Sequence, residues 1–295
     1  MIKLDKDKAT YNFNPTNPPA IQIEPGETIL FETTDALDGQ IHSDDDPATN
    51  IDLGHVNAAT GPVYINGSHP GDTLVAEILE IKPWNWGAAL IIPGFGFLQD
   101  TLPGPYTKVF HFGKDGYIDW GGKLRIPLRP MIGTIGVSPK EAITTLSSGI
   151  HGGNLDTTDI CVGSKVHLPV LVEGALFSVG DVHAVMGDGE VCGTGVESGA
   201  EIMIRLELLP GKTIPRPRIE TPTEIMTIAS AESLDLAIKT SLLDMVDWLI
   251  EEKNLTAEEA YVLISITGDV RIGQIVDPAV TVRVALPRNI FLADK

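Results

Sequence analysis

The residues best suited to chemistry in this sequence are gathered in one segment, residues 151–197. Histidines and acids there stand beside glycines or other small residues, which allow polar groups to converge on a small ligand. The candidates are His151, Asn154, Asp156, Asp181, His183, Asp188, Glu190 and Glu197. The sequence therefore predicts a binding or catalytic site in this segment.

Asp181 and His183 are two residues apart, so on a β-strand both side chains lie on one face. A carboxylate and an imidazole on one face, joined by a third donor, form a site for a divalent metal ion. Glycines at 187 and 189 indicate a turn, and a hairpin there would bring Glu190 beside the first pair. The same residues also fit a simpler interpretation, a turn with solvated acids next to a hydrogen-bonded histidine.

Other catalytic chemistries lack their motifs. The sequence has no Gly-x-Ser-x-Gly elbow and no P-loop. Cys161 and Cys192 have no base near them in sequence, so a covalent nucleophile is unsupported, although a base could arrive in space. Outside the segment, His55 is a further candidate, because it follows a glycine and precedes Val56-Asn57.

Hydrophobic alternation predicts a mainly β protein. Residues 28–33, 73–81 and 201–209 are β-branched or alternate between apolar and polar types. Residues 83–105, rich in Gly, Pro and Trp, are interpreted as an ordered loop. Residues 138–141, Ser-Pro-Lys-Glu, carry the signals of a helix start.

The C-terminal region differs in its hydrophobic spacing. Apolar residues recur at helical intervals over residues 233–252, and Thr256 with Glu259 predicts a capping box for a second helix to about residue 266. A final strand is expected over residues 280–284. We expect a β-sandwich-type core over 1–210 that carries most of the site, with a smaller α+β part over 211–295 packed on it.

The composition limits the partners. The formal net charge is -19, from 40 acids against 21 bases, which disfavours nucleic acid and anionic substrates and suits a neutral small molecule or a cation. Two cysteines without metal spacing fit a reducing compartment. A polar N-terminus and the lack of a long apolar stretch predict a cytoplasmic protein that has no contact with a membrane.

Several blocks of the sequence resemble the acetamidase/formamidase family. They follow one another in order across most of the chain, and Ser68-His69 departs from the family's usual Ala-Glu. The blocks are Thr34-Asp35-Ala-Leu-Asp-Gly-Gln40, Gly61-Pro-Val-Tyr-Ile-Asn-Gly67, Pro70-Gly-Asp-Thr-Leu74, His151-Gly-Gly-Asn-Leu-Asp156, Gly163-Ser164, Leu168-Pro-Val170, Ser178-Val-Gly-Asp-Val-His-Ala184 and Gly187-Asp-Gly-Glu190.

The resemblance implies hydrolysis of formamide or acetamide to ammonia and a carboxylate, by a homodimer that holds zinc or calcium. A divalent metal would lower the pKa of a bound water toward ~7, and the hydroxide would attack the amide carbon. Positions that match the blocks are assigned as candidate metal ligands, namely Asp35, Asp156, Asp181, His183 and Glu197, and as candidate catalytic residues, namely His151, Asn154 and Glu190.

Two alternatives stay open from the residues themselves. A cupin-like metalloenzyme uses similar ligands, an Asp-x-His pair and a glutamate after a glycine-rich gap. A non-catalytic β-sandwich could instead bind a small ligand through a metal held by the same acids. Release of ammonia from acetamide would separate the proposed hydrolase from both.

Overall fold

Two large β-sheets pack face to face in the computed structural model, which describes residues 2–292. Apolar side chains of both sheets meet in one core, which includes Phe31 and Ile204 from one sheet and Phe177 and Ile135 from the other. Residues 28–33 of the first sheet bury alternate side chains, whereas every residue of 131–136 and 177–183 in the second sheet is buried. The expected β-sandwich-type core is confirmed.

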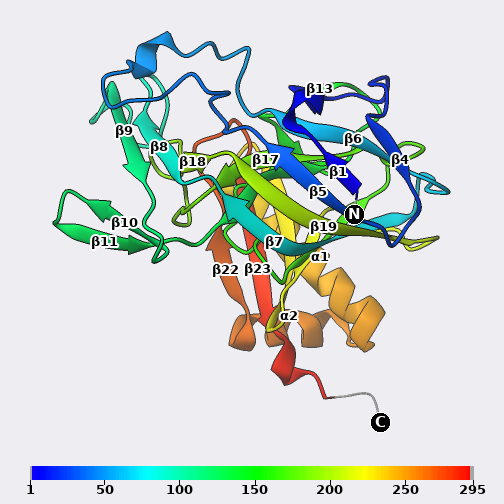
Figure 1. Ribbon diagram of the computed structural model, residues 1–295. Coiled ribbons are helices and arrows are strands. Elements are labelled where there is room, and N and C mark those ends of the chain that lie inside the picture. The colour runs from blue at the N-terminus through cyan, green and yellow to red at the C-terminus, as the bar shows by residue number, and fades with distance from the viewer. Residues whose placement is uncertain (1, 293–295) are drawn as a thin grey trace.

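The first sheet has nine strands and runs the length of the molecule (Figure 1). All neighbours are antiparallel except β1 and β5. In spatial order the strands are β1 (Ile2–Leu4), β5 (Thr28–Thr33), β19 (Ala200–Leu209), β7 (Thr73–Pro83), β16 (Lys165–Pro169), β20 (Arg218–Glu220), β21 (Glu224–Ala231), β23 (Val280–Pro287) and β22 (Asp269–Ile272).

The second sheet has ten strands and carries the site segment. Its main path is β14 (Ser148–Gly149), β15 (Gly152–Asn154), β12 (Met131–Gly136), β17 (Phe177–His183), β18 (Glu197–Ser198), β8 (Trp86–Ile91) and β9 (Tyr106–His111), while β6 (Ala59–Ile65) joins β17 to β2 (Ala9–Thr10) and β4 (Ile21–Ile23). Two small sheets pair β10 (Tyr117–Trp120) with β11 (Leu124–Pro127), and β3 (Asn12–Phe13) with β13 (Ile143–Thr144).

Both predicted helices are present, α1 (Leu234–Lys253) and α2 (Ala257–Thr267). The capping box is confirmed, because the Thr256 side chain accepts from the Glu259 backbone N–H and Glu259 reaches back to the Thr256 N–H. A separate apolar cluster, which includes Trp248 and Ile264, packs the helices against β21 and β23 at one end of the molecule (Figure 1). Neither helix, nor any other in the described residues, is long and apolar enough to cross a membrane.

Two local predictions are wrong. Residues 138–141 do not form a helix; they follow β12, and the Ser138 backbone N–H donates to the Ala175 carbonyl of a distant segment. Residues 83–105 are not all loop, since they contain β8, which pairs along its length with β9. The C-terminal strands β20 to β23 continue the nine-stranded sheet, and the division at residue 210 stays a prediction.

Three 3₁₀ turns, η1 (Lys6–Lys8), η2 (Ala48–Asn50) and η3 (Arg288–Ile290), complete the described secondary structure.

Candidate active site

Strand β17 places the first two site residues. Asp181 has a positive φ of 55° inside the strand, and its Oδ1 lies 3.2 Å from Nε2 of His183. Glu197 on β18 is the direct cross-strand partner of His183, and its Oε2 lies 3.1 Å from the same Nε2. The predicted proximity of Asp181 and His183 is confirmed, and the antiparallel pairing of β17 with β18 adds Glu197 to them.

Two turns bring further acids to the same imidazole. Glu190 ends the predicted turn at 187–190 and its Oε1 lies 4.0 Å from His183 Nε2. Asp156, just after β15, lies 3.8 Å away through Oδ1. This approach requires glycine at 133 on β12, since a Cβ there would lie 2.4 Å from oxygens of both Asp156 and Asp181.

We call Asp156, Asp181, His183, Glu190 and Glu197 the His183 cluster. All five side chains are buried, and four carboxylates face one imidazole nitrogen. Ligand atoms of Asp156, His183 and Glu190 lie within 4.8 Å of one another, as do those of Asp181, His183 and Glu197. The cluster thus offers two overlapping sets of donors of the types that bind divalent cations.

Burial and mutual repulsion shift the titration of the cluster. Burial raises the pKa of Glu197 to about 7 and raises the pKa values of Asp156 and Glu190 well above their usual range, with neighbouring carboxylates adding to the effect. Burial alone would lower the pKa of His183, but the charges of Glu197 and Asp181 outweigh it and raise that pKa. Because the acids outnumber the imidazole, their raised pKa values mean that carboxyl groups of the cluster retain protons where no cation balances them.

Unpaired oxygens provide a test of whether a metal ion fits. Both carboxylate oxygens of Asp156 are buried without a hydrogen-bond partner among residues 2–292. Such groups are costly to bury unless they pair or coordinate a cation. A divalent cation coordinated by the His183 cluster would satisfy these oxygens and balance the excess of carboxylates, so the residues present fit a metal ion.

A polar network continues from the cluster. Asn154 accepts hydrogen bonds from Asn57 Nδ2 at 2.9 Å and Thr134 Oγ1 at 2.6 Å, and its own Nδ2 donates to Asp277 at 2.9 Å. The same Asn57 and Thr134 side chains reach Asp181 at 3.3 Å. Burial raises the pKa of Asp277 to about 6. The network fixes the orientation of the Asn154 amide at the site.

Sequence reasoning missed Asn57, Thr134 and Asp277. Asn57 has a positive φ of 53°, and no periodic signal distinguishes the loop that carries Asp277. All three are joined to Asn154 only by the tertiary fold. Asn57 could have been predicted as a site residue from its position two residues after the candidate His55.

Three predicted candidates lie apart from the cluster. Asp35 accepts hydrogen bonds from the backbone N–H groups of Leu37 and Gly39, which makes it a turn-forming carboxylate. His151 is buried against the Phe13 ring, at 5.1 Å between centroids, and burial lowers its pKa to about 4. His55 is exposed and pairs with Asp52 at 2.8 Å.

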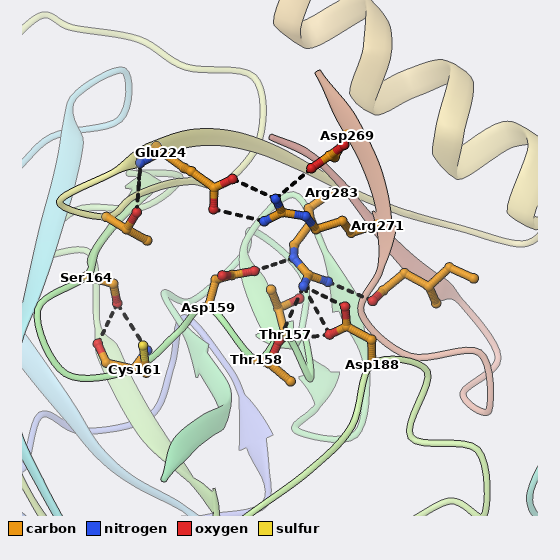
Figure 2. Close-up of polar contacts among 12 residues, drawn as sticks. Thr157, Thr158, Asp159, Cys161, Ser164, Asp188, Glu224, Asp269, Arg271 and Arg283 are labelled. Carbon is orange, nitrogen blue, oxygen red and sulfur yellow. Dashed lines mark hydrogen bonds and ion pairs between the residues drawn. The ribbon is translucent and has the colours of Figure 1, made fainter. Parts of the chain in front are cut away.

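A second charge group, built on the buried side chain of Arg283, supports the loops of the first (Figure 2). The Arg283 guanidinium on β23 donates to Asp159 and to both oxygens of Asp188, at 2.9 and 3.0 Å, and lies within 3.3 Å of Thr158. Thr158 in turn donates to Asp188 at 2.8 Å. We call Arg283, Thr158, Asp159 and Asp188 the Arg283 cluster. It ties the turn that carries Asp156 to the turn that carries Glu190.

The His183 cluster borders a cavity of about 430 Å³. Asp181, Glu190 and Glu197 line its inner part together with Asn154 and Asp277. Fold and site together define a mainly β protein whose buried imidazole and carboxylates open on a ligand-sized cavity, the arrangement of a candidate metal-dependent enzyme.

The chain belongs to the acetamidase/formamidase family, whose model matches residues 2–146 and 139–293. It is similar to a crystal structure of acetamidase from Bacillus halodurans, with 40% sequence identity, a TM-score of 0.96 and 98% of each chain covered. It is 27% identical over 279 residues to an acetamidase of Mycolicibacterium smegmatis and 26% identical over 277 residues to a formamidase of Methylophilus methylotrophus, covering 71% of this chain and 68% of each relative.

Proposed function

We propose that this protein is an amidase that hydrolyses short aliphatic amides, such as formamide or acetamide, to a carboxylate and ammonia. Membership of the acetamidase/formamidase family supports the reaction, and the names of the relatives support the substrates. The single observation that carries the proposal from the structure is the His183 cluster at the inner end of the cavity. A cupin-like enzyme and a non-catalytic binder have no comparable support.

The proposed metal ligands are Asp156, Asp181, His183 and Glu197. A divalent cation there would supply a Lewis acid that makes water nucleophilic near neutral pH. One imidazole among the donors favours zinc over calcium, because calcium prefers oxygen ligands alone. Asp35 is not included, since its oxygens are already used by backbone N–H groups.

Asn154 is the proposed group that orients the amide. Its side-chain NH₂ has two hydrogens, of which one goes to Asp277. The other is left to donate to the substrate carbonyl oxygen and to the negative charge that develops on it during attack. Asn57 and Thr134 keep the amide from rotating, because they occupy its oxygen.

Glu190 is the proposed proton carrier. It lines the cavity beside the other acids and is held by a turn whose backbone pairs with Gly273 and Ile275 of the C-terminal segment. A carboxyl at this place can take a proton from the attacking water and pass it to the departing ammonia. His151 lies behind the cavity against Phe13, so its proposed contribution is to position Gly153 and Asn154 of β15.

The test combines elemental analysis, chelation and an ammonia assay. We expect bound zinc, release of ammonia from acetamide, and loss of turnover after complete chelation that zinc restores. Glu190→Gln should lower kcat by about 100-fold or more while the metal content stays. The matched control is Asp244→Asn, a buried acid paired with Arg216 at 2.8 Å away from the site, which should keep its activity.

Full turnover in rigorously metal-free protein would contradict the metal role, and absence of ammonia release from every short amide would contradict the function itself. The homodimer and the cytoplasmic location that the resemblance and composition suggest also remain proposals. Sedimentation of the purified protein tests the first, and cell fractionation tests the second.

A further inference from the structure

The cavity at the site has two chemically different parts. Its inner part is the polar group described above, whereas its outer walls are apolar. The wall residues are Leu37, Leu53, Val56, Ile92, Phe95 and Leu146. Leu37 and Val56 are buried, and Ile92, Phe95 and Leu146 are half-buried. Strands carry most of the polar groups, while the apolar walls come from loops after β5, β8 and β13.

The position of the Phe95 ring is fixed by a close contact. Gly193, with a φ of 93°, follows the Glu190 turn, and a Cβ on it would lie 2.3 Å from the Phe95 ring. Phe97 donates its backbone N–H to the Val191 carbonyl at 2.9 Å, which holds the same loop against the same turn. The apolar wall is therefore built against the segment that presents Glu190.

The volume exceeds what formamide or acetamide can fill. A cavity of about 430 Å³ corresponds to roughly fourteen water molecules at ~30 Å³ each. A two-carbon amide seated at the polar end leaves the walls facing water that has few polar partners. Replacing such water with an apolar group gains affinity.

The charge of the inner part restricts what the rest of the ligand can be. Four acidic residues border the cavity, namely Asp181, Glu190, Glu197 and Asp277. They would repel a carboxylate group on the acyl chain of the substrate. The walls are mainly apolar, with Thr144, Ser147 and Thr194 as isolated hydroxyl groups, so they favour an apolar chain over a polar tail. The amide group belongs at the polar end and an uncharged hydrocarbon chain along the walls.

We infer that the preferred substrates are primary amides with an apolar acyl chain of several carbons, in the range of butanamide to hexanamide. The inference rests on the proposed amidase function and specifies its substrate class.

A substrate series tests the inference with the metal-loaded protein. Each buried methylene is worth about threefold to fourfold in kcat/KM, so hexanamide should exceed acetamide by roughly 100-fold. Acetamide turnover with a flat or falling trend from acetamide to hexanamide would overturn the inference and leave the proposed function intact. Absence of turnover for the whole series would overturn both.

Variants with larger side chains in the outer part of the cavity provide a second test of the inference. Val56→Phe, or Leu146→Phe at a half-buried position that tolerates the larger ring more easily, should lower the ratio of hexanamide to acetamide kcat/KM at least tenfold. The matched control is Val262→Phe, at an exposed position on α2, which should leave the ratio at its wild-type value. An unchanged ratio in folded Val56→Phe and Leu146→Phe protein would contradict the placement of the chain along these walls.

Discussion

The described residues contain two charge clusters, one buried throughout around His183 and one built on the buried guanidinium of Arg283 with more exposed partners, and they are balanced in opposite ways. In the Arg283 cluster, one guanidinium meets two carboxylates, a hydroxyl and the Ile272 carbonyl, so each charge has a partner. In the His183 cluster, four carboxylates surround one imidazole, and the carboxylate of Asp156 has no hydrogen bond within the described residues. In the Arg283 cluster every charged group is paired with another protein group, whereas in the His183 cluster a bound cation would pair the remaining carboxylates. Incomplete pairing of buried charge therefore distinguishes the binding site from its support.

The largest expected effect comes from breaking the balanced cluster. Arg283→Met should lower the free energy of unfolding by about 3 kcal/mol, because it removes the buried guanidinium that hydrogen-bonds to both turns and leaves the half-buried Asp159 carboxylate without its cation. Urea denaturation of the metal-free protein measures it. Arg271→Met is the matched control, since Arg271 lies opposite Arg283 in the β22–β23 ladder and also pairs with two acids, Glu224 and Asp269, but its own side chain is half-buried and not fully buried (Figure 2). If the two variants lost the same free energy of unfolding, the ion pairs of Arg283 would contribute no more to stability than those of Arg271.

Binding of zinc to the His183 cluster should instead raise the free energy of unfolding. At free zinc 100 times its dissociation constant, the free energy of unfolding should rise by about 2.7 kcal/mol. Asp181→Asn should remove most of this gain, and asparagine tolerates the positive φ at that position. Calorimetric titration and thermal unfolding measure both quantities. Asp244→Asn serves again as the buried-acid control, and loss of the zinc effect in that variant would contradict the assignment.

A smaller effect is expected from pH in the metal-free protein. The pKa of Glu197, raised to about 7, means that the folded state holds a proton that the unfolded state has released, so stability falls as pH rises through 7. We expect a loss of about 1 kcal/mol between pH 6.5 and 8. Below pH 6.5 the buried His151, with its pKa lowered to about 4, acts in the opposite direction. Glu197→Gln should flatten the alkaline fall, and an unchanged slope in that variant would exclude Glu197 as its cause.

The smallest expected effect is that of a change in the Arg283 cluster on zinc binding at the His183 cluster. Thr158→Val removes the hydroxyl that donates to Asp188 and should cost about 1 kcal/mol. If the Arg283 cluster positions Asp156 and Glu190, the zinc dissociation constant should also rise severalfold. Ser164→Ala deletes a comparable hydroxyl, which donates to the Cys161 carbonyl at 2.7 Å, and should leave zinc affinity unchanged (Figure 2). Equal zinc affinity in Thr158→Val and wild type would mean that the clusters act independently.

Local signals made part of this structure predictable. Helices α1 and α2 follow from apolar spacing and from caps that Ser233 and Thr256 form within their own turns. The pairing of Asp181 with His183 follows from the two-residue period of a strand. These features depend on residues close together in sequence, where side-chain chemistry alone decides the outcome.

Long-range partners explain what the sequence did not reveal. Residues 138–141 have helix-start signals, yet they stay irregular and contact a distant segment, where the Ser138 N–H donates to Ala175. Arg283 looks like the polar position of an alternating strand, and only the arrival of the Asp159 and Asp188 turns makes it a buried anchor. Asp277 joins the site from a loop near β23 for the same reason. Contacts between loops of different sheets do not produce a periodic pattern in the sequence, so they could not be predicted from it.

The late position of β23 in the chain has a consequence for biosynthesis. Ribosomes deliver the acids at 156, 159, 188 and 190 well before Arg283 emerges, and β23 must then insert between β21 and β22. Until that insertion the two acidic turns have no shared anchor, although the earlier strands can already condense. We therefore expect the site to be completed only after this insertion, since a nascent chain that stalls before β23 would carry every proposed ligand but would lack the anchor that holds the turns of Asp156 and Glu190.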